Sequence, residues 1–366
     1  MDYHKIKKPT LVLDEGKCRK NIRSMSEKAK KSGVIFRPHF KTHQSATVGE
    51  WYREEGITNI TVSSVTMARY FSGCGWNNIT IAFPFNTREI DEAKETAEHS
   101  SLNILISGIE HLQEVTGKIN FEAGCFIKFN TGYNRSGVEW NDYETIVRMV
   151  EDINKKKYLR MKGFLTHSGH TYHASSAHKV LEIFNDTILK TGELKKHLSS
   201  SDLIYSMGDT PSCSIAEDFP GFDEIRPGNF VFYDLMQCMI GSCQREQIAV
   251  AVICPVADVN KRRNEVIIYG GAIHLSKDSI MLYDGSRIFG EAAFPSENGW
   301  EFPVERIFVK SLSQEHGILS VPEKYRKEFH PGGLVAVIPV HACLAVDLLR
   351  EYHLPDGRLI NSISPK

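Results

Sequence analysis

A lysine flanked by histidines is the part of this sequence whose residue types most directly indicate covalent chemistry. In the segment VIFRPHFKTH, residues 34–43, Lys41 stands between His39 and His43, and Arg37 precedes all three. A lysine that reacts as a nucleophile depends on neighbouring positive charge or on desolvation, and these neighbours could supply the charge. Taken alone, the segment also fits a solvent-exposed basic loop, so its meaning depends on the rest of the chain.

A second chemically capable pair is His341 and Cys343, in the apolar segment LVAVIPVHACLAV, residues 334–346. The alternation of this segment predicts a strand, in which residues i and i+2 face the same side about 6–7 Å apart. Imidazole and thiolate are ligands that zinc prefers. A core histidine beside a buried cysteine is the alternative. Because two ligands fall short of the usual three or four, a metal here would also need water, substrate or a distant residue.

The elements that must position these residues form a repeating pattern. Mostly helical patterns separate eight short apolar segments, which are residues 34–37, 58–62, 78–82, 102–106, 125–129, 161–165, 202–206 and 223–226. Strands that alternate with helices predict a parallel sheet, and eight of them indicate a (β/α)8 TIM barrel in the α/β class. An open doubly wound sheet is the alternative, and the absence of a GxGxxG motif after the first strand disfavours it.

The composition changes after about residue 240. Segments 247–255, 265–269, 301–309 and 334–340 are rich in β-forming residues, with Gly and Pro turns between them. This pattern predicts a C-terminal antiparallel β domain. We therefore expect a cofactor-binding barrel over residues 14–240 and a β domain over residues 241–366, joined by the strand-like residues 1–13.

The barrel prediction gathers several polar loops at one rim, because functional groups of such barrels lie just after the strands. Lys41 follows the first strand, and loops 130–137, 166–172, 207–211 and 226–229 follow the last four. Gly208 and Gly228 let backbone N–H groups approach an anion, as at the usual phosphate site of these barrels. Each loop alone also fits an ordinary turn. A phosphate site facing Lys41 predicts pyridoxal 5'-phosphate (PLP) held as a Schiff base.

The overall composition excludes several classes of protein. The 366 residues are 41% hydrophobic and 24% charged with a net charge of −1, so neither nucleic acid nor a membrane is expected as a partner. The N-terminus lacks an apolar signal segment, and residues 334–349 are too short and too polar to span a bilayer. The eight cysteines include no CxxC pair, which favours a reducing, cytoplasmic setting.

The motifs together resemble a known family. PHFKTH, NTGYNRSGV, THSGHTY, GDTPSC, EIRPGNFVFYD, SQEHG and PVHAC occur in the order found in the D-threonine aldolase/D-serine dehydratase family. These are fold-type III PLP enzymes related to alanine racemase, and the resemblance covers about residues 8 to 350. It implies a barrel, a C-terminal β domain and a homodimer with active sites near the subunit interface.

The resemblance also implies roles for individual residues. Lys41 matches the Schiff-base lysine, Arg135 the arginine near the phenolate oxygen of the cofactor, and Tyr172 a tyrosine near its ring. His167 lies at the same strand end as Tyr172. The residues implied to hold the phosphate are Gly208, Asp209, Thr210, Gly228, Asn229 and Tyr233. Asp209 departs from the neutral residue expected there, because a carboxylate would repel phosphate, which leaves its backbone N–H to serve.

The resemblance also implies a metal site, in which His341 and Cys343 match the family's ligands of Zn²⁺ or another divalent metal. Aldolase members of the family usually have His-x-Asp at this position, whereas dehydratase members have His-x-Cys, as here. We therefore predict a PLP- and zinc-dependent lyase that dehydrates a β-hydroxy D-amino acid, with D-serine converted to pyruvate and ammonia. Lys41, Tyr172, His341 and Cys343 are its predicted catalytic residues.

Several other functions fit most of the same residues. A D-threonine aldolase would cleave Cα–Cβ to give glycine and an aldehyde, and a D-threo-3-hydroxyaspartate dehydratase would need a cation for the extra carboxylate. If the protein were an amino-acid racemase, the His-Ala-Cys segment would have no function. A non-enzymatic PLP-binding protein would lack the C-terminal β domain. A purely structural protein would leave the glycine-rich loops around Lys41 unexplained.

Overall fold

The computed structural model describes residues 3–198 and 202–363, which form two compact units. Among the described residues, the barrel unit comprises Ile22–Gly228 and Ile240–Ser242. The described part of the β unit comprises residues 3–21, Asn229–Met239 and residues 243–363. The domain boundaries expected at residues 14 and 240 stay a prediction, because compactness of a unit does not test independent folding.

The barrel unit is built on eight parallel strands. They are β2 (Ile35–Phe36), β3 (Ile60–Val62), β4 (Asn78–Pro84), β5 (Ser101–Ile106), β6 (Ala123–Asn130), β8 (Leu159–Thr166), β9 (Ile204–Met207) and β10 (Glu224–Ile225). Their order is β2-β10-β9-β8-β6-β5-β4-β3, with the short β7 (Val138–Glu139) beside β6. A parallel bridge between His39 and Thr61 joins the two ends. The predicted TIM-like barrel with a C-terminal antiparallel domain is confirmed.

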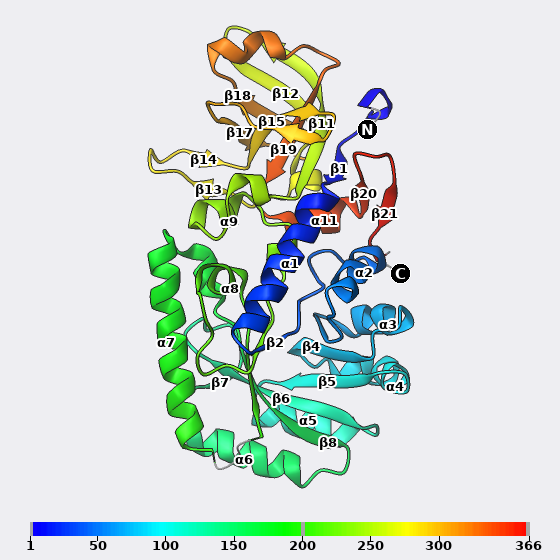
Figure 1. The fold of residues 1–366 in the computed structure, drawn as a ribbon, viewed down its shortest axis with the longest axis vertical. Helices are drawn as coiled ribbons and strands as arrows, with labels where there is room; N and C mark the ends of the chain where they lie inside the picture. Colours follow the sequence, from blue (N-terminus) through cyan, green and yellow to red (C-terminus); the bar gives the residue numbers. More distant parts are fainter. Residues whose placement is uncertain (1–2, 199–201, 364–366) are drawn as a thin grey trace. The chain divides into compact units, whose positions relative to one another are not determined.

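Helices follow most of these strands, as the alternating pattern predicts. They are α2 (Ala46–Glu54), α3 (Val65–Gly73), α4 (Ile90–Ala97), α5 (Ile109–Lys118), α6 (Tyr143–Asn154), α7 (Ala177–Lys196) and α8 (Thr210–Ile215), and α1 (Glu15–Lys31) precedes β2. In Figure 1, α3, α4, α6 and α7 lie outside the strands. Helix α6 illustrates why these segments are helical. Asp142 caps its start by accepting a hydrogen bond from the Thr145 N–H, and one face of the helix buries Ile146, Met149 and Ile153.

A polar network crosses the interior of the barrel. Glu224 is fully buried and accepts hydrogen bonds from Arg37 Nε and from Ser206 Oγ, each at 2.6 Å. Ser206 Oγ in turn accepts from Arg226 Nε at 2.6 Å. Since the one hydroxyl proton of Ser206 points to Glu224, its oxygen is free to accept from Arg226. The network therefore fixes the direction in which the Arg226 side chain leaves β10.

The β unit holds the second sheet. Its strands are β1 (Thr10–Leu13), β11 (Val250–Asn260), β12 (Glu265–Tyr269), β15 (Gly290–Ser296), β16 (Gly299–Glu301), β17 (Ile307–Leu312), β18 (His316–Ser320), β19 (Leu334–Pro339), β20 (Glu351–His353) and β21 (Leu359–Asn361). The pairings are antiparallel except β1 with β20, and β12 pairs with both β18 and β11. Strand β1 lies between β11 and β20, within this sheet.

The remaining elements are short. Strands β13 (Ile280–Met281) and β14 (Arg287–Ile288) form a separate hairpin. The other helices are α9 (Leu235–Ile240), α10 (Ala272–Leu275) and α11 (Ala342–Leu349). Single 3-10 turns cover Tyr3–Lys5, Thr87–Glu89, Gly169–His173, Asn229–Val231, Arg245–Gln247 and Glu323–Glu328.

The strand expected to run through His341 and Cys343 ends earlier. Strand β19 stops at Pro339, and His341 is the N-cap residue of α11. Proline cannot donate to a sheet ladder, and the following Ala-Cys-Leu-Ala-Val segment contains good helix formers. The strand prediction for residues 341–346 was therefore wrong, and this pair lies at a strand-to-helix turn.

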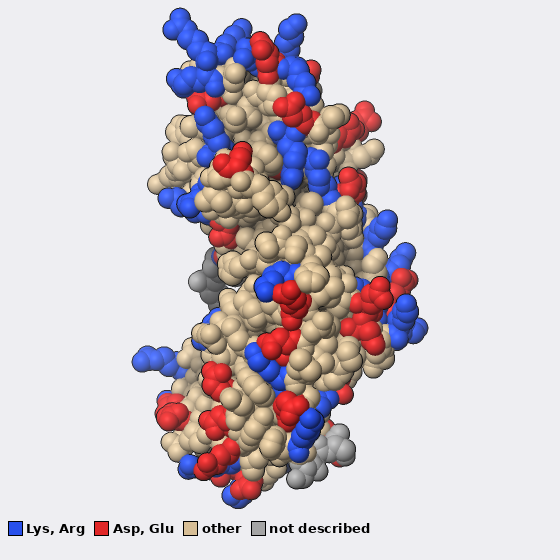
Figure 2. Space-filling view, turned by 90° about the vertical axis from the view of Figure 1, so that its left-hand side faces the viewer, with Lys and Arg blue, Asp and Glu red and all other residues tan. Residues whose placement is uncertain are grey.

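The surface shows charges of both signs. Figure 2 shows Lys and Arg interspersed with Asp and Glu on one face, in keeping with the net charge of −1. Among the helices of residues 3–198 and 202–363, none has the length and apolar character needed to cross a bilayer.

Candidate active site

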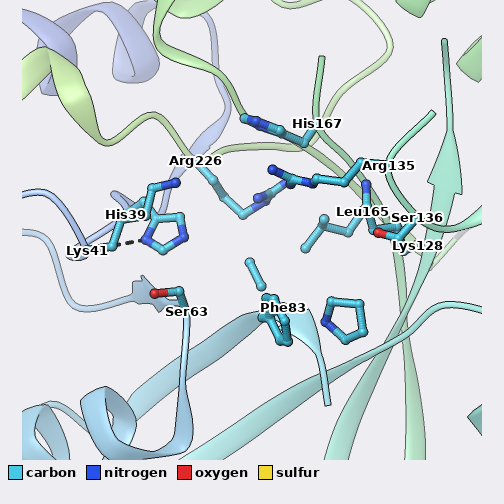
Figure 3. A pocket seen from close by; sticks show the side chains of 12 residues that line it. His39, Lys41, Ser63, Phe83, Lys128, Arg135, Ser136, Leu165, His167 and Arg226 are labelled. Atoms are coloured by element: carbon cyan, nitrogen blue, oxygen red, sulfur yellow. Dashed lines mark hydrogen bonds between the residues drawn. The ribbon is translucent and has the colours of Figure 1, made fainter. Parts of the chain in front are cut away.

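A cavity of about 300 Å³ lies at the carboxyl ends of the barrel strands. Its lining residues are His39, Lys41, Ser63, Ala82, Phe83, Pro84, Lys128, Arg135, Ser136, Leu165, His167 and Arg226. They come from the ends of β2, β3, β4, β6, β8 and β10 or from the loops that follow (Figure 3). Four of them are Lys or Arg, and no carboxylate is among the described residues that line the cavity.

Lys41 reaches this cavity from the loop after β2. Its side chain is exposed, whereas the residues on either side are buried. The Lys41 N–H donates to His39 Nδ1 at 3.4 Å, and the His39 N–H donates to the Pro227 carbonyl at 2.9 Å. A Cβ on Gly228 would come within 2.9 Å of the His39 carbonyl oxygen. Glycine at residue 228 therefore lets the loop after β10 pack against the Lys41 loop.

The neighbours expected to supply charge to Lys41 do not do so. Burial, and then the charge of Lys41, lower the pKa of His39 well below its ordinary value. Burial lowers the pKa of His43 to about 3, and its ring stacks on Tyr52 with centroids 5.6 Å apart. Arg37 forms an ion pair with Glu224 at 2.6 Å. Both histidines are thus neutral near pH 7. The expectation that these three sequence neighbours supply positive charge to Lys41 was wrong.

Positive charge in the cavity comes instead from residues far away in the sequence. Arg135 follows β6, Arg226 follows β10, and Lys128 lies inside β6. Burial, and then Arg226 and Arg135, lower the pKa of Lys128 to about 7. Burial lowers the pKa of Arg226 to about 10, so its guanidinium stays charged at neutral pH. In Figure 3 the Arg135 and Arg226 side chains approach one another from two different strand ends.

The loop after β8 contacts the loop after β9. His167 Nδ1 is hydrogen-bonded to the Gly208 carbonyl, and burial lowers the pKa of His167 well below its ordinary value. A Cβ on Gly208 would lie 3.1 Å from Arg226 Cβ and Nη1, so glycine permits this close packing. His167 therefore lines the cavity as a neutral imidazole whose orientation is fixed by the backbone.

The carboxylate of Asp209, which was not expected at a phosphate site, caps a helix. Its Oδ1 caps α8, accepting from the Ser212 N–H at 2.7 Å and from Thr171 Oγ1 at 3.0 Å. Burial raises the pKa of Asp209 to about 6, and its Oδ2 is buried with no hydrogen-bond partner in the described chain. The carboxylate thus stabilises the helix start at a cost in desolvation.

Tyr172 and Thr210 meet each other. The Thr210 N–H donates to the Tyr172 hydroxyl at 3.3 Å. The Tyr172 ring lies 6.4 Å from the His167 ring between centroids. Neither Tyr172 nor Thr210 is among the described residues that line the cavity, so the roles implied for them stay predictions.

The β unit brings His341 and Cys343 together. Burial lowers the pKa of His341, but the Cys343 charge and hydrogen bonds to Asp278 and Cys343 outweigh it and raise the pKa to about 11. The distance from His341 Nδ1 to Asp278 Oδ2 is 2.9 Å. A carboxylate that holds one ring nitrogen is the arrangement commonly found behind a metal-binding histidine.

Asn229 and Tyr233 belong to the β unit as well. Asn229 Nδ2 donates to Asp234 Oδ2 at 2.5 Å and contacts Cys343 Sγ at 3.7 Å. The Ala342 N–H also donates to Asp234 Oδ2, at 3.0 Å. Tyr233 is buried with φ at 49°. The phosphate roles implied for Asn229 and Tyr233 stay predictions.

The two implied cofactors fit their sites to different degrees. A cationic cavity with an exposed amine and closely packed glycine loops suits an anionic aldehyde such as PLP. His341 and Cys343 are of the types that bind zinc. Within residues 3–198 and 202–363, however, no three His, Cys, Asp or Glu residues are grouped as metal ligands. A metal held here therefore needs water or substrate to complete its coordination.

Two cations of the cavity, Lys128 and Arg226, were not predicted as site residues. Lys128 interrupts the apolar segment CFIKF, residues 125–129, and a charged residue in a fully buried strand is a signal of function or strain. Arg226 directly follows the eighth strand, where barrel sites are expected. Their shared role became visible only when β6 and β10 were both placed around one cavity.

A family model described as the alanine racemase N-terminal domain matches residues 13–235. The chain belongs to this family. A second model, described as a putative serine dehydratase domain, matches residues 249–354 of the same alanine racemase-like chain. The two matches fall on the barrel-forming part and on the C-terminal antiparallel part of the chain.

Relatives match this alanine racemase-like chain over nearly its whole length. A D-serine dehydratase of Dictyostelium discoideum is 26% identical over 100% of this chain and 98% of its own. A D-threo-3-hydroxyaspartate dehydratase of Delftia sp. (strain HT23) is 25% identical over 92% and 90%. An alanine racemase-like protein from Idiomarina loihiensis superposes with a TM-score of 0.89 at 22% identity, over 100% and 99%.

Proposed function

We propose that this protein is a PLP-dependent lyase that removes water from a β-hydroxy D-amino acid, with D-serine as the first candidate. The observation that carries the proposal is an exposed lysine, Lys41, at the mouth of a cavity lined by Arg135, Arg226 and Lys128. The dehydratases that match along the full chain support the same reaction class.

The cavity residues have separable tasks in this reaction. Lys41 holds the cofactor and, as a free amine, takes the proton from Cα of the substrate. Arg135 and Arg226 provide positive charge for an anionic ligand, and no carboxylate among the described lining residues compensates it. PLP, when bound, supplies a ring that stabilises negative charge at Cα.

We further propose that His341 and Cys343 hold a divalent metal, with zinc the first candidate. Asp278 keeps the His341 imidazole oriented, and the Asp234 carboxylate fixes the Ala342 backbone between the two ligands. Zinc supplies a Lewis acid that makes hydroxide a better leaving group. A related solved structure, that of a cysteine-to-alanine variant of a D-threo-3-hydroxyaspartate dehydratase, is described as the metal-free form of that enzyme.

A second candidate substrate is 3-hydroxy-D-aspartate. This substrate carries one carboxylate more than D-serine and therefore needs one more cation. Lys128 lines the cavity and has no other role in the proposed reaction, so it could bind that carboxylate. A D-threonine aldolase remains the alternative reaction, since a fold match to an aldolase exists at 18% identity and a TM-score of 0.82. The His-x-Cys pair favours dehydration over that alternative.

The deciding experiment supplies the purified, PLP-loaded protein with D-serine, D-threonine or 3-hydroxy-D-aspartate, with zinc and with a chelator. Pyruvate and ammonia from D-serine, lost on chelation and restored by zinc, are the expected products. Glycine and acetaldehyde from D-threonine, without a keto acid, would move the chain to the aldolases. Oxaloacetate from 3-hydroxy-D-aspartate at a much higher kcat/KM would favour the second candidate.

Covalent cofactor attachment without turnover of any of the three substrates would contradict the lyase and leave a PLP-binding protein. We also propose a homodimer, which sedimentation would test, and a reducing, cytoplasmic setting. All eight cysteines are free thiols, which is consistent with that setting.

A further inference from the structure

The loop that carries Arg135 to the cavity returns to the strand from which it starts. Strand β7 pairs in parallel with the end of β6, and the register places Glu139 opposite Asn130. The Trp140 N–H also donates to the Asn130 carbonyl, at 3.2 Å. Residues 131–137 therefore form a loop that begins and ends beside Asn130, and Arg135 lies within it.

The side chain of Asn130 binds this loop at several points. It is buried, and its Oδ1 accepts from the Gly132 N–H at 3.2 Å and from the Asn134 N–H at 3.0 Å. Its Nδ2 donates to Asn134 Oδ1 at 2.8 Å and to Glu139 Oε1 at 2.9 Å. A side-chain amide has two acceptor lone pairs and two N–H donors, so these four bonds use its whole hydrogen-bonding capacity.

The loop backbone adopts conformations that need such support. Asn134 has φ at 57°, in the left-handed region, and Gly132 and Gly137 have φ at 124° and 109°. A residue with a side chain adopts the left-handed region at a cost in free energy, and it stays there only where surrounding contacts fix it. Because Arg135 directly follows Asn134, this turn sets the direction in which the Arg135 side chain leaves the loop.

The end of the Arg135 side chain lies over a ring of the same loop. Arg135 Cζ is 5.0 Å from the centroid of the Tyr133 ring. A Cβ on Gly169 would overlap the Tyr133 ring, so glycine lets this ring pack against the loop after β8. The guanidinium is thus supported within its own loop, and in Figure 3 it extends into the cavity towards Arg226.

We propose that Asn130 is the positioning residue for Arg135 and that its four hydrogen bonds keep the Arg135 guanidinium in place for the anionic ligand of the cavity. The identity of that ligand, PLP, rests on the proposed function. Asn130 is not among the described residues that line the cavity, so it acts through the loop. A cation that is already fixed binds an anion without the entropy cost of ordering its side chain.

A double-mutant cycle on PLP affinity separates this role from a general effect on stability. Asn130→Ala and Arg135→Gln should each weaken PLP binding by about 10-fold, because each weakens a charged contact to the ligand. The double variant should bind PLP no more weakly than Arg135→Gln alone, because Asn130 acts through Arg135. An absorbance titration of the full chain with PLP measures the affinities. Losses that multiply in the double variant would overturn the proposal.

A second pair of variants exchanges the donor and the acceptor. Asn130→Asp removes both N–H donors and sets a carboxylate against Glu139, so PLP binding should weaken. Adding Glu139→Gln supplies an N–H donor from the other side and should restore most of the affinity. Asn130→Asp that stays equally weak after this addition would contradict the proposal.

Asn86→Ala is the matched control for Asn130→Ala. Asn86 also accepts from a backbone N–H and donates to a carboxylate, that of Glu89, in the loop after β4. Neither residue lines the cavity around Lys41 among the described residues. PLP affinity should therefore not change in Asn86→Ala, and a loss equal to that of Asn130→Ala would contradict a specific role of Asn130.

The exposed Asn134 tests the same backbone conformation without a change in the interior. Alanine adopts φ near 57° only at a cost in free energy, whereas glycine adopts it freely. Asn134→Gly should therefore bind PLP more tightly than Asn134→Ala. Equal affinities of these two variants would contradict the claim that this turn places Arg135.

Amide hydrogen exchange reports on the loop without the cofactor. The N–H groups of Gly132 and Asn134 are bonded to Asn130, so the peptide covering residues 131–137 should exchange faster in Asn130→Ala than in the natural chain. Unchanged exchange would overturn the proposal. Absence of PLP binding in the natural chain would instead refute the proposed function, and faster exchange in Asn130→Ala would still support the role of Asn130.

Discussion

The cavity around Lys41 and the turn at His341 and Cys343 assemble their chemistry in opposite ways. The cavity draws its cations from several strand ends of a closed barrel, and two of them, Lys128 and Arg226, are buried. The turn has both of its reactive residues within one segment of three. Two residues that contact this turn, Asp234 and Asp278, come from more than 60 residues earlier.

This difference shows which surrounding residues each site depends on. Removing a residue beneath the cavity changes a buried network in which charges are strongly coupled. Removing a residue behind the turn changes only the orientation of one imidazole. We therefore expect substitutions in the barrel unit to have the larger effects, and the predictions below run from the largest to the smallest.

Lys41→Ala tests the centre of the cavity. Activity should fall by at least about 10³-fold, because both cofactor attachment and proton removal are lost. Borohydride reduction and peptide mass spectrometry should find PLP on the Lys41 peptide of the natural chain and nowhere in the variant. Lys31→Ala, an exposed lysine at the end of α1, is the matched control and should be fully active. Undiminished turnover in Lys41→Ala would remove the cavity from the mechanism.

Glu224→Gln tests the network beneath the cavity. The change leaves Arg37 buried without its counter-charge, so the free energy of unfolding should fall by about 3 kcal/mol. The exposed pair of Arg160 and Glu122, at 2.9 Å, gives the control, since Glu122→Gln should cost less than about 1 kcal/mol. Denaturant titration of both variants measures the difference, and equal losses would refute the special role of the buried pair.

Asp209→Asn tests the pH dependence of the barrel unit. Burial raises the folded-state pKa of Asp209 from 3.8 to about 6, so the folded chain binds this proton more tightly than the unfolded chain. The contribution of Asp209 to stability therefore falls as pH rises from about 4 to 6, by on the order of 3 kcal/mol. Asparagine keeps the helix cap without the charge, so Asp209→Asn should lack this fall when unfolding is measured from pH 4 to 8. Parallel curves would contradict the prediction.

Asp278→Asn tests the support of the turn. Zinc affinity should fall by about 10- to 100-fold, because the carboxylate orients His341 through Nδ1. His341→Ala should abolish binding. Competition with a chromogenic chelator measures both, and the exposed Asp258→Asn should bind zinc as the natural chain does. Unchanged affinity in Asp278→Asn would show that the turn needs no support from that residue.

The barrel was predictable because its signal is local. Each strand is a short apolar run, and most of the connecting segments carry a helical pattern. The exposed position of Lys41 after the first barrel strand follows from the same pattern. Lys128 was not predicted as a partner of Lys41, because no local pattern relates residues that are 87 positions apart.

The sequence by itself determined the alternation of strands and helices, the place of Lys41 at a strand end, and the His-x-Cys pair. Hydrophobic period and turn chemistry act over a few residues, so they can be read without coordinates. Only the tertiary structure decided which side chains contribute positive charge to the cavity. Desolvation and ion pairing depend on what the fold places around a group. Burial lowers the pKa of His39 and His43, and Arg37 pairs with Glu224, whereas Arg226 stays charged at neutral pH.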